Sequence, residues 1–136
     1  MTLALDSWIV LAWLKNQEPG AGMMASLWEW AAAGKARLVM SIVNLGEVYY
    51  LAAKSRDESY AQTVIDNLRQ RRVEIVPAPN DLVLEAAALK ARYPISYADA
   101  FAAATAMQYK AALATGDPDF RSLESDGLRL HWAGTA

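Results

Sequence analysis

Four carboxylic acids stand in apolar stretches of the chain, whereas most of the other acids have polar neighbours. They are Asp6, Glu47, Asp99 and Asp117. A carboxylate surrounded by apolar side chains is costly unless hydrogen bonds, a basic partner or a metal ion compensates its charge. No Lys or Arg lies within four residues of Glu47 or Asp99, so neither has a salt-bridge partner nearby in the sequence. The four acids are therefore candidates for a metal site.

Each of these acids also stands where a helix can begin. Asp6 precedes an apolar segment typical of a buried helix, which makes it a good N-cap residue. Asp117 precedes Pro118, a residue favoured at the first helical position. The other two acids follow good capping residues by the three-residue spacing of a capping box, from Asn44 to Glu47 and from Ser96 to Asp99. Taken singly, each acid is more simply explained as part of a helix cap.

Taken together, the four positions favour a common site. Asp6 and Asp117 each follow a short apolar run that predicts a buried strand. The carboxyl ends of parallel strands share one edge of a sheet, where ligands bind, and helices that start there point towards the same crevice. Carboxylates that converge repel each other unless a cation lies between them. A set of oxygen ligands without His or Cys suits Mg²⁺ or Mn²⁺, and such an ion favours phosphodiester hydrolysis over acyl transfer.

The elements that must position these acids alternate between short apolar strands and longer helices. Strands are predicted at residues 3–5, 37–41, 73–76, 111–114 and 128–130, and helices at residues 8–14, 23–33, 44–54, 59–71, 80–92 and 96–110. The stretch from Pro19 to Gly22 breaks the pattern and is predicted to be a loop. This alternation predicts an α/β fold of three layers, with a central, mostly parallel sheet and helices on both faces. At 136 residues, the chain is expected to form a single domain over residues 1–136.

Composition narrows the classes of function. The 13 basic and 15 acidic residues give a net charge of −2, so bulk electrostatics do not attract nucleic acid. The chain has no Cys and a single His, His131, which argues against thiol catalysis, Cys-bound zinc and a His-dependent triad. There is no signal sequence and no apolar run of membrane-spanning length, so we expect a cytoplasmic protein without a membrane partner.

Aromatic residues gather in the N-terminal part of a chain that is 54% hydrophobic. Core packing explains each of them singly, but as a group they predict an interface with another chain, because aromatic residues are enriched in such contacts. The group consists of Trp8, Trp13, Trp28, Trp30, Tyr49 and Tyr50.

Four motifs in register resemble the PIN-domain ribonucleases and, within that family, the small VapC-like toxins of type II toxin–antitoxin modules. The motifs run in order between about residue 3 and residue 120. They are Leu5-Asp6-Ser7, the stretch from Ser41 to Glu47, the Ala-rich segment from Ala98 through Asp99 to Ala106, and the turn from Thr115 through Asp117 and Asp119 to Phe120.

This resemblance implies a three-layer PIN-like domain and a divalent-metal-dependent endoribonuclease that hydrolyses RNA as a toxin. It implies that Asp6, Glu47, Asp99 and Asp117 are the catalytic and metal-binding acids, with Asp119 as a further metal ligand. Mg²⁺, or alternatively Mn²⁺, is the implied cofactor. The implied partners are an RNA substrate, a cognate antitoxin that covers the acidic cleft, and a second copy of the chain in a homodimer.

One residue departs from the family pattern. Trp8 stands where the family often has a small or polar residue, which predicts a narrower cleft or a different choice of substrate. The neighbouring hydroxyl of Ser7 and that of Thr115 can orient a water or a carboxylate, but their place in turns explains both hydroxyls more simply.

Two other functions compete with the nuclease. A receiver-like phosphoryl-transfer domain is also a small α/β fold with an acidic Mg²⁺ site, but it requires adjacent acids after the first strand, where this chain has Asp6-Ser7. The second alternative is a catalytically inactive PIN-like interaction module in which the acids only cap helices.

Overall fold

A five-stranded sheet forms the centre of the computed structural model, which describes residues 1–134; the last two residues of the predicted domain lie outside them. All four strand pairs are parallel, and the strand order is β3-β2-β1-β4-β5. The strands are β1 (Thr2–Leu5), β2 (Arg37–Ser41), β3 (Val73–Val76), β4 (Ala112–Thr115) and β5 (Leu130–Trp132). The mostly parallel sheet predicted from the sequence is therefore confirmed.

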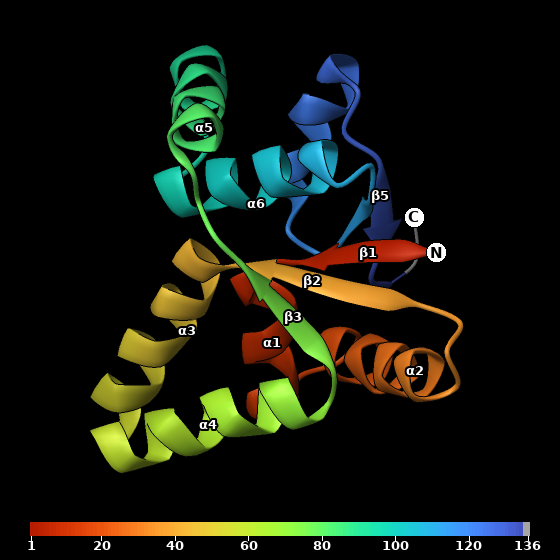
Figure 1. Ribbon diagram of the computed structural model, residues 1–136, viewed down its shortest axis with the longest axis vertical. Coiled ribbons are helices and arrows are strands. Elements are labelled where there is room, and N and C mark those ends of the chain that lie inside the picture. Colours follow the sequence, from red (N-terminus) through yellow and green to blue (C-terminus); the bar gives the residue numbers. More distant parts are fainter. Residues whose placement is uncertain (135–136) are drawn as a thin grey trace.

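Four helices cover one face of this sheet (Figure 1). They pack on alternate strand residues, among them Leu3, Leu5 and Met40, because successive strand side chains point to opposite faces. The helices are α1 (Ser7–Leu14), α2 (Gly20–Ala32), α3 (Ile42–Ser55) and α4 (Glu58–Gln70).

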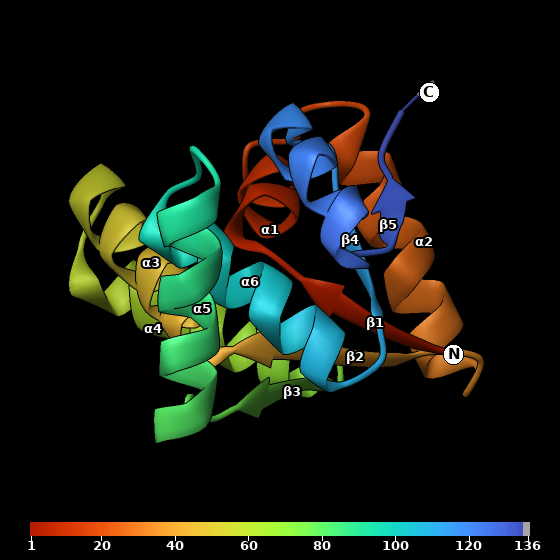
Figure 2. The ribbon, with the colours of Figure 1, turned by 90° about the horizontal axis from the view of Figure 1, so that it is seen from above.

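Three helices form the layer on the opposite face, whose apolar core includes Ala4, Val39 and Leu113; Figure 2 shows this layer from above. They are α5 (Asn80–Arg92), α6 (Tyr97–Gln108) and the 3₁₀-helix η1 (Pro118–Asp126). The predicted three-layer α/β fold, with helices on both faces, is confirmed. No helix within residues 1–134 has the length and apolar character needed to cross a membrane.

Small side chains let α6 come close to the sheet. Every residue from Ala100 to Ala106 is buried, and the helix contacts β1, β2 and β4 as well as α3 and α5. A helix that is buried all round cannot present large side chains on every side. The run of alanines therefore brings the first turn of α6, which carries Asp99, next to the carboxyl end of the sheet.

The predicted loop from Pro19 to Gly22 is wrong, because α2 already begins at Gly20. A Cβ atom at Gly20 would lie 2.5 Å from that of Ala12 and 3.0 Å from Cζ3 of Trp8. The N–H of Gly22 donates to the carboxylate of Glu18 at 3.0 Å, which satisfies one of the free donors of the first turn. Gly20 permits close packing of α1 on α2, and neither Gly20 nor Gly22 interrupts the helix.

The predicted cap at Asn44 is also wrong. Helix α3 begins at Ile42, and its N-cap is Ser41, whose hydroxyl oxygen accepts a hydrogen bond from the N–H of Val43 at 3.2 Å. Asn44 lies inside the helix, fully buried. The last strand is also shifted, from the predicted residues 128–130 to Leu130–Trp132, because the N–H of Leu128 still donates to the carbonyl oxygen of Leu123 in the preceding 3₁₀-helix at 3.3 Å.

The order of the strands separates this fold from the receiver-like alternative. Flavodoxin-like domains, to which receivers belong, have the order 2-1-3-4-5. Here β1 lies between β2 and β4, and the chain turns from one side of β1 to the other after β3. The receiver-like alternative is therefore wrong.

Candidate metal centre

The candidate acids lie where the strand order reverses. Asp6 directly follows β1, and Thr115 ends the neighbouring strand β4, with Asp117 two residues further. In open parallel sheets, ligands bind in the crevice outside the strand ends at such a point. The topology therefore places these acids where the fold class has its binding sites.

Asp6 is held on both carboxylate oxygens. Oδ1 accepts the N–H of Ile9 at 3.0 Å and so caps α1, as predicted. Oδ2 accepts the hydroxyl of Thr115 at 2.6 Å. The residue as a whole is 1% exposed. A helix cap and a place in the acid cluster are thus compatible for this residue.

Burial raises the pKa of Asp6 from 3.8 to about 7. The hydrogen bonds from Thr115 and Ile9 lower this pKa, and the negative charges of Asp99 and Asp117 raise it. The protonated and ionised forms are therefore comparably populated near neutral pH. A cation beside Asp6 would favour the ionised form.

Asp99 stands in the first turn of α6. Its N–H donates to the hydroxyl oxygen of Ser96 at 3.1 Å, so the predicted cap at Ser96 is confirmed. The pKa of Asp99 is raised to about 6, first by burial and then by the charge of Asp117; Glu47 and Asp119 add smaller increases, and a hydrogen bond between the side chains of Ser96 and Asp99 lowers it. Charges from α3 and from the region of η1 therefore act together on this carboxyl.

Asp117 and Asp119 lie at the start of η1. The carboxylate of Asp117 accepts the N–H of Asp119 at 3.0 Å and caps the helix, as predicted. One carboxylate oxygen each from Asp99, Asp117 and Asp119 lies within 4.8 Å of the others. Three carboxylate oxygens at this spacing fit a hard cation such as Mg²⁺ or Mn²⁺.

Glu47 lies outside that group of three, on α3, where it is partly buried. Its Oε1 accepts a hydrogen bond from the hydroxyl of Ser7, at the start of α1. Its charge still contributes to the raised pKa of Asp99. Glu47 thus faces the cluster from the α3 side, and a hydroxyl of α1 fixes its orientation.

Two hydroxyls and one amide position these acids. The hydroxyls of Ser7 and Thr115, which the sequence explained more simply as turn hydroxyls, each donate to a site carboxylate. Asn44 was missed as a positioning residue. Its Nδ2 donates to the carbonyl oxygen of Ala98 at 2.9 Å and ties α3 to the first turn of α6, beside Asp99. No local pattern signals this role, because the carbonyl oxygen of Ala98 lies 54 residues away in the sequence.

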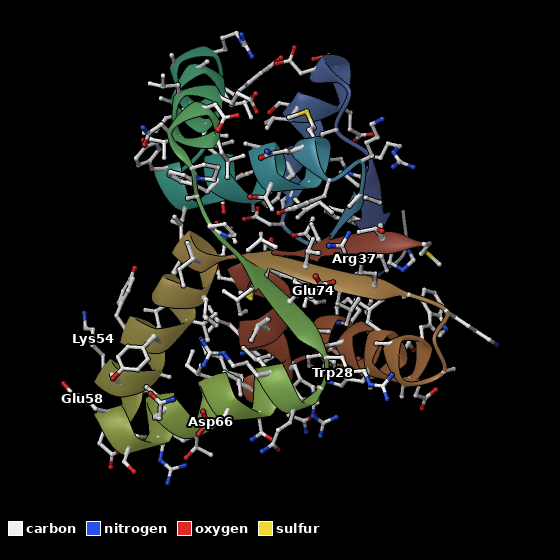
Figure 3. All side chains as sticks on the ribbon, in the orientation of Figure 1. Trp28, Arg37, Lys54, Glu58, Asp66 and Glu74 are labelled. Atoms are coloured by element: carbon white, nitrogen blue, oxygen red, sulfur yellow. The ribbon has the colours of Figure 1, made fainter. Side chains whose placement is uncertain are left out.

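Basic side chains do not neutralise the site. The ion pairs are Arg37–Glu74 at 2.6 Å (Figure 3), Arg92–Asp126 at 3.2 Å and Arg121–Glu124 at 3.6 Å. Within residues 1–134, none of the five acids forms an ion pair with Lys or Arg. Hydrogen bonds and a bound cation are therefore the available compensation.

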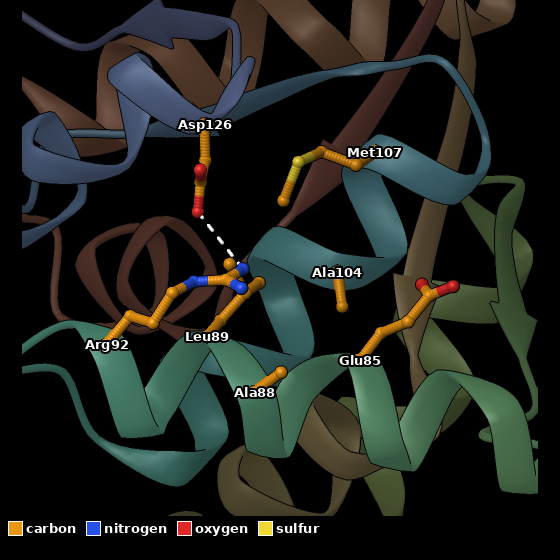
Figure 4. A pocket seen from close by; sticks show the side chains of 7 residues that line it. All are labelled: Glu85, Ala88, Leu89, Arg92, Ala104, Met107 and Asp126. Carbon is orange, nitrogen blue, oxygen red and sulfur yellow. Dashed lines mark hydrogen bonds and ion pairs between the residues drawn. The ribbon is translucent and has the colours of Figure 1, made fainter.

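A cavity of about 380 Å³ lies away from these acids, between α5, α6 and η1 (Figure 4). It is lined by apolar residues such as Leu89 and Met107 and crossed by the Arg92–Asp126 ion pair. None of the five candidate acids lines it. It is a separate feature of the α5–α6 layer.

Comparison with known proteins agrees with this architecture. The family model of the PIN domain matches residues 3–125, and no curated protein matches the chain. A chain of VapBC2 from Rickettsia felis, solved with a DNA fragment of its promoter, is 20% identical with a TM-score of 0.75, over 98% of this chain and 100% of that one.

Two further solved structures are similar. VapBC-1 from nontypeable Haemophilus influenzae is 22% identical with a TM-score of 0.72, over 97% of this chain and 98% of that one. VapC20 of Mycobacterium tuberculosis, described as a toxin that cleaves the sarcin–ricin loop, is 18% identical with a TM-score of 0.69, over 93% of this chain and 95% of that one. At these identities, the likeness shows a shared fold.

Proposed function

Because the chain belongs to the PIN domain family, we propose that it is a divalent-metal-dependent endoribonuclease that hydrolyses phosphodiester bonds of RNA. The observation that carries the proposal is the approach of carboxylate oxygens of Asp99, Asp117 and Asp119 to within 4.8 Å of one another. Asp6 and Glu47 complete the site, because the charge of Asp99 raises the pKa of Asp6 and that of Glu47 raises the pKa of Asp99.

Each acid has a distinct task in this proposal. Asp99, Asp117 and Asp119 hold the cation, and Asp6 completes the ligand set. A bound Mg²⁺ or Mn²⁺ supplies Lewis-acid stabilisation of the charge that develops on the phosphate and lowers the pKa of a water. Glu47 is fixed by Ser7 through Oε1, which leaves Oε2 to accept a hydrogen bond from the attacking water.

We also propose that the chain acts as the toxin of a toxin–antitoxin pair. The support is the match to VapBC structures along nearly the whole length of both chains. A cognate antitoxin would cover the acidic cleft and block access of RNA. A toxin that cleaves RNA acts where RNA is found, so we infer a cytoplasmic location.

A homodimer is part of the same proposal, but most of the aromatic residues predicted to form its interface pack against the core. Of that group only Tyr50 is exposed; Trp28 is buried, and the others are partly buried: Trp8, Trp13, Trp30 and Tyr49. Large apolar side chains are exposed near the starts of three helices: Ile42 on α3 at 44%, Leu84 on α5 at 69% and Tyr97 on α6 at 44%. Contact with a second copy would remove this apolar surface from water. Sedimentation at micromolar concentration should show twice the monomer mass of 14.9 kDa; a 14.9 kDa species would contradict the dimer.

Cleavage of a broad RNA pool tests the nuclease. We expect activity with Mg²⁺ or Mn²⁺ that EDTA abolishes, and loss of activity in Asp99→Asn and Glu47→Gln. The matched controls are Asp66→Asn and Glu58→Gln, which change exposed acids on α4 (Figure 3) and should cleave normally. Cleavage that survives EDTA, or no cleavage with either metal, would contradict the proposal.

The inactive interaction module is the second candidate function. It is favoured by the caps that Asp6 forms with the N–H of Ile9 and Asp117 with that of Asp119, both at 3.0 Å. Asn caps a helix about as well as Asp. If the acids only cap helices, Asn variants should therefore keep both the stability and the metal response of the chain.

A further inference from the structure

The indole of Trp8 lies against the backbone at two glycines. A Cβ atom at Gly116 would overlap Cη2 of the indole and lie 2.8 Å from both Cζ2 and Cζ3. At Gly20, the first residue of α2, a Cβ would lie 3.0 Å from Cζ3. The outer ring of Trp8 therefore occupies the space that side chains at these two positions would need.

Gly116 is a glycine for reasons of space. The positive backbone φ angles recorded for glycines are those of Gly34, Gly127 and Gly134, so Gly116 does not need the conformational freedom that usually explains a glycine in a turn. What a side chain there meets is Trp8. The large residue at position 8 and the missing side chain at position 116 thus form a size-matched pair.

This pair lies at the turn that carries a candidate metal ligand. Gly116 stands between Thr115 and Asp117, and the N–H of Asp117 donates to Thr115 Oγ1 at 3.1 Å. The same hydroxyl donates to Asp6 at 2.6 Å. One side of the turn is therefore held by these hydrogen bonds and the other side by the indole.

We propose that Trp8 is a positioning residue of the metal centre, which fixes the turn from Thr115 to Asp117 so that the Asp117 carboxylate faces those of Asp99 and Asp119. The inference rests on the proposed function, because it assumes that these three carboxylates bind a cation. Trp8 touches neither the cation nor the RNA in this role and acts through the backbone at Gly116.

A double-mutant cycle with Mn²⁺ as the probe tests the pair. The variants are Gly116→Ala, Trp8→Phe and their combination, because Phe keeps an aromatic ring on α1 but is shorter than the indole. The dissociation constant for Mn²⁺ is measured by electron paramagnetic resonance, and melting in EDTA checks that each variant folds. The control is Gly46→Ala, at a helical glycine where a Cβ meets no atom within 4 Å.

We expect Gly116→Ala to weaken Mn²⁺ binding about tenfold and Trp8→Phe about threefold, with the double variant no weaker than Trp8→Phe alone, since coupled neighbours are not additive. Gly46→Ala should bind Mn²⁺ like the unsubstituted chain. Weaker Mn²⁺ binding by Gly116→Ala at a temperature where its melting curve in EDTA shows it to be folded is a result that a general loss of stability would not produce.

Three results would overturn the inference. Binding of Mn²⁺ by Gly116→Ala within about twofold of the unsubstituted chain would do so, and so would a double variant weakened by the product of the single effects. Neither result contradicts the proposal that the three carboxylates bind a metal ion. If the unsubstituted chain binds no Mn²⁺, the proposed function is wrong, and the inference falls with it.

Discussion

The hydroxyl of Thr115 donates a hydrogen bond of 2.6 Å to Oδ2 of Asp6, across 109 residues of sequence. It joins the carboxyl ends of β4 and β1, which are neighbours in the sheet. The hydroxyl oxygen of Thr115 also accepts a hydrogen bond from the N–H of Asp117, at 3.1 Å. A single side chain therefore orients one buried carboxyl and the backbone beside another candidate ligand.

Replacing Thr115 by Val should cost about 1–3 kcal/mol of unfolding free energy, because a buried carboxyl loses a hydrogen-bond donor. The pKa of Asp6 should rise further, since this hydrogen bond lowers it. Urea denaturation measures the free energy. The matched control is Thr105→Val, whose buried hydroxyl has no hydrogen-bond partner within residues 1–134, so this variant should be as stable as the unsubstituted chain or more stable. Equal losses in both variants would contradict the role given to Thr115.

The metal-free chain should lose stability as the pH rises from about 5 to about 7. The pKa of Asp6 is raised from 3.8 to about 7 and that of Asp99 to about 6, so the folded chain binds more protons than the unfolded chain in this range. The free energy of unfolding therefore falls with rising pH and levels off above about pH 7.

Urea midpoints in EDTA at a series of pH values measure this dependence. The variant Asp6→Asn lacks the carboxyl with the larger pKa shift. Its free energy of unfolding should therefore fall less steeply with rising pH than that of the unsubstituted chain. Stability that rises between about pH 5 and pH 7 in the unsubstituted chain would contradict the raised pKa values.

Removing one charge from the cluster should stabilise the metal-free chain and weaken its response to metal. Asp99→Asn relieves repulsion from Asp117, so the Tm in EDTA should rise by a few degrees. For a Kd of about 1 mM, about 10 mM Mg²⁺ adds about 1.4 kcal/mol to the unsubstituted chain, and Asp99→Asn should lose most of this gain. Asp66→Asn on α4 is the control and should keep it. An equal Mg²⁺-induced gain in stability in both variants would show that Asp99 does not bind the metal ion and only contributes to the helix cap.

Asn44→Ala should weaken metal binding, although Asn44 is not itself a candidate ligand. The variant loses the 2.9 Å hydrogen bond to the carbonyl oxygen of Ala98, which should cost about 1–3 kcal/mol and loosen the first turn of α6. Calorimetric titration with Mn²⁺ should show weaker binding. Asn67→Ala, on α4, should bind Mn²⁺ normally. Unchanged Mn²⁺ binding in Asn44→Ala would show that α6 does not depend on this contact.

Local patterns account for most of the fold. Short apolar runs predicted β1 to β4 to within about a residue. The inner strands β2, β1 and β4 are apolar along most of their length because they are buried on both faces, and the edge strand β3 still has Val73, Ile75 and Val76. The caps at Asp6, Ser96 and Asp117 were predicted as well, since capping depends on residues three or fewer positions apart. These elements bring the acids of the first, third and fourth motifs to one edge.

Contacts between distant residues were beyond such patterns. Nothing near Gly20 in the sequence signals that Ala12 and Trp8 pack against it, so a glycine that permits close packing was taken for part of a loop. Asn44 was taken for a cap because its partner, the carbonyl of Ala98, lies 54 residues away. The bond between Thr115 and Asp6 depends on β1 and β4 being neighbours, which the order of strands along the chain does not specify.

Diffraction from crystals soaked in Mn²⁺ tests the central claim most directly, because the anomalous signal locates the ion without any assumption about activity. We predict a peak at the carboxyl edge of the sheet, within coordinating distance of carboxylate oxygens of Asp99, Asp117 and Asp119, and no peak there in Asp99→Asn crystals. Crystals of the unsubstituted chain with no Mn²⁺ peak among these carboxylates, at a concentration that saturates any millimolar site, would contradict the account.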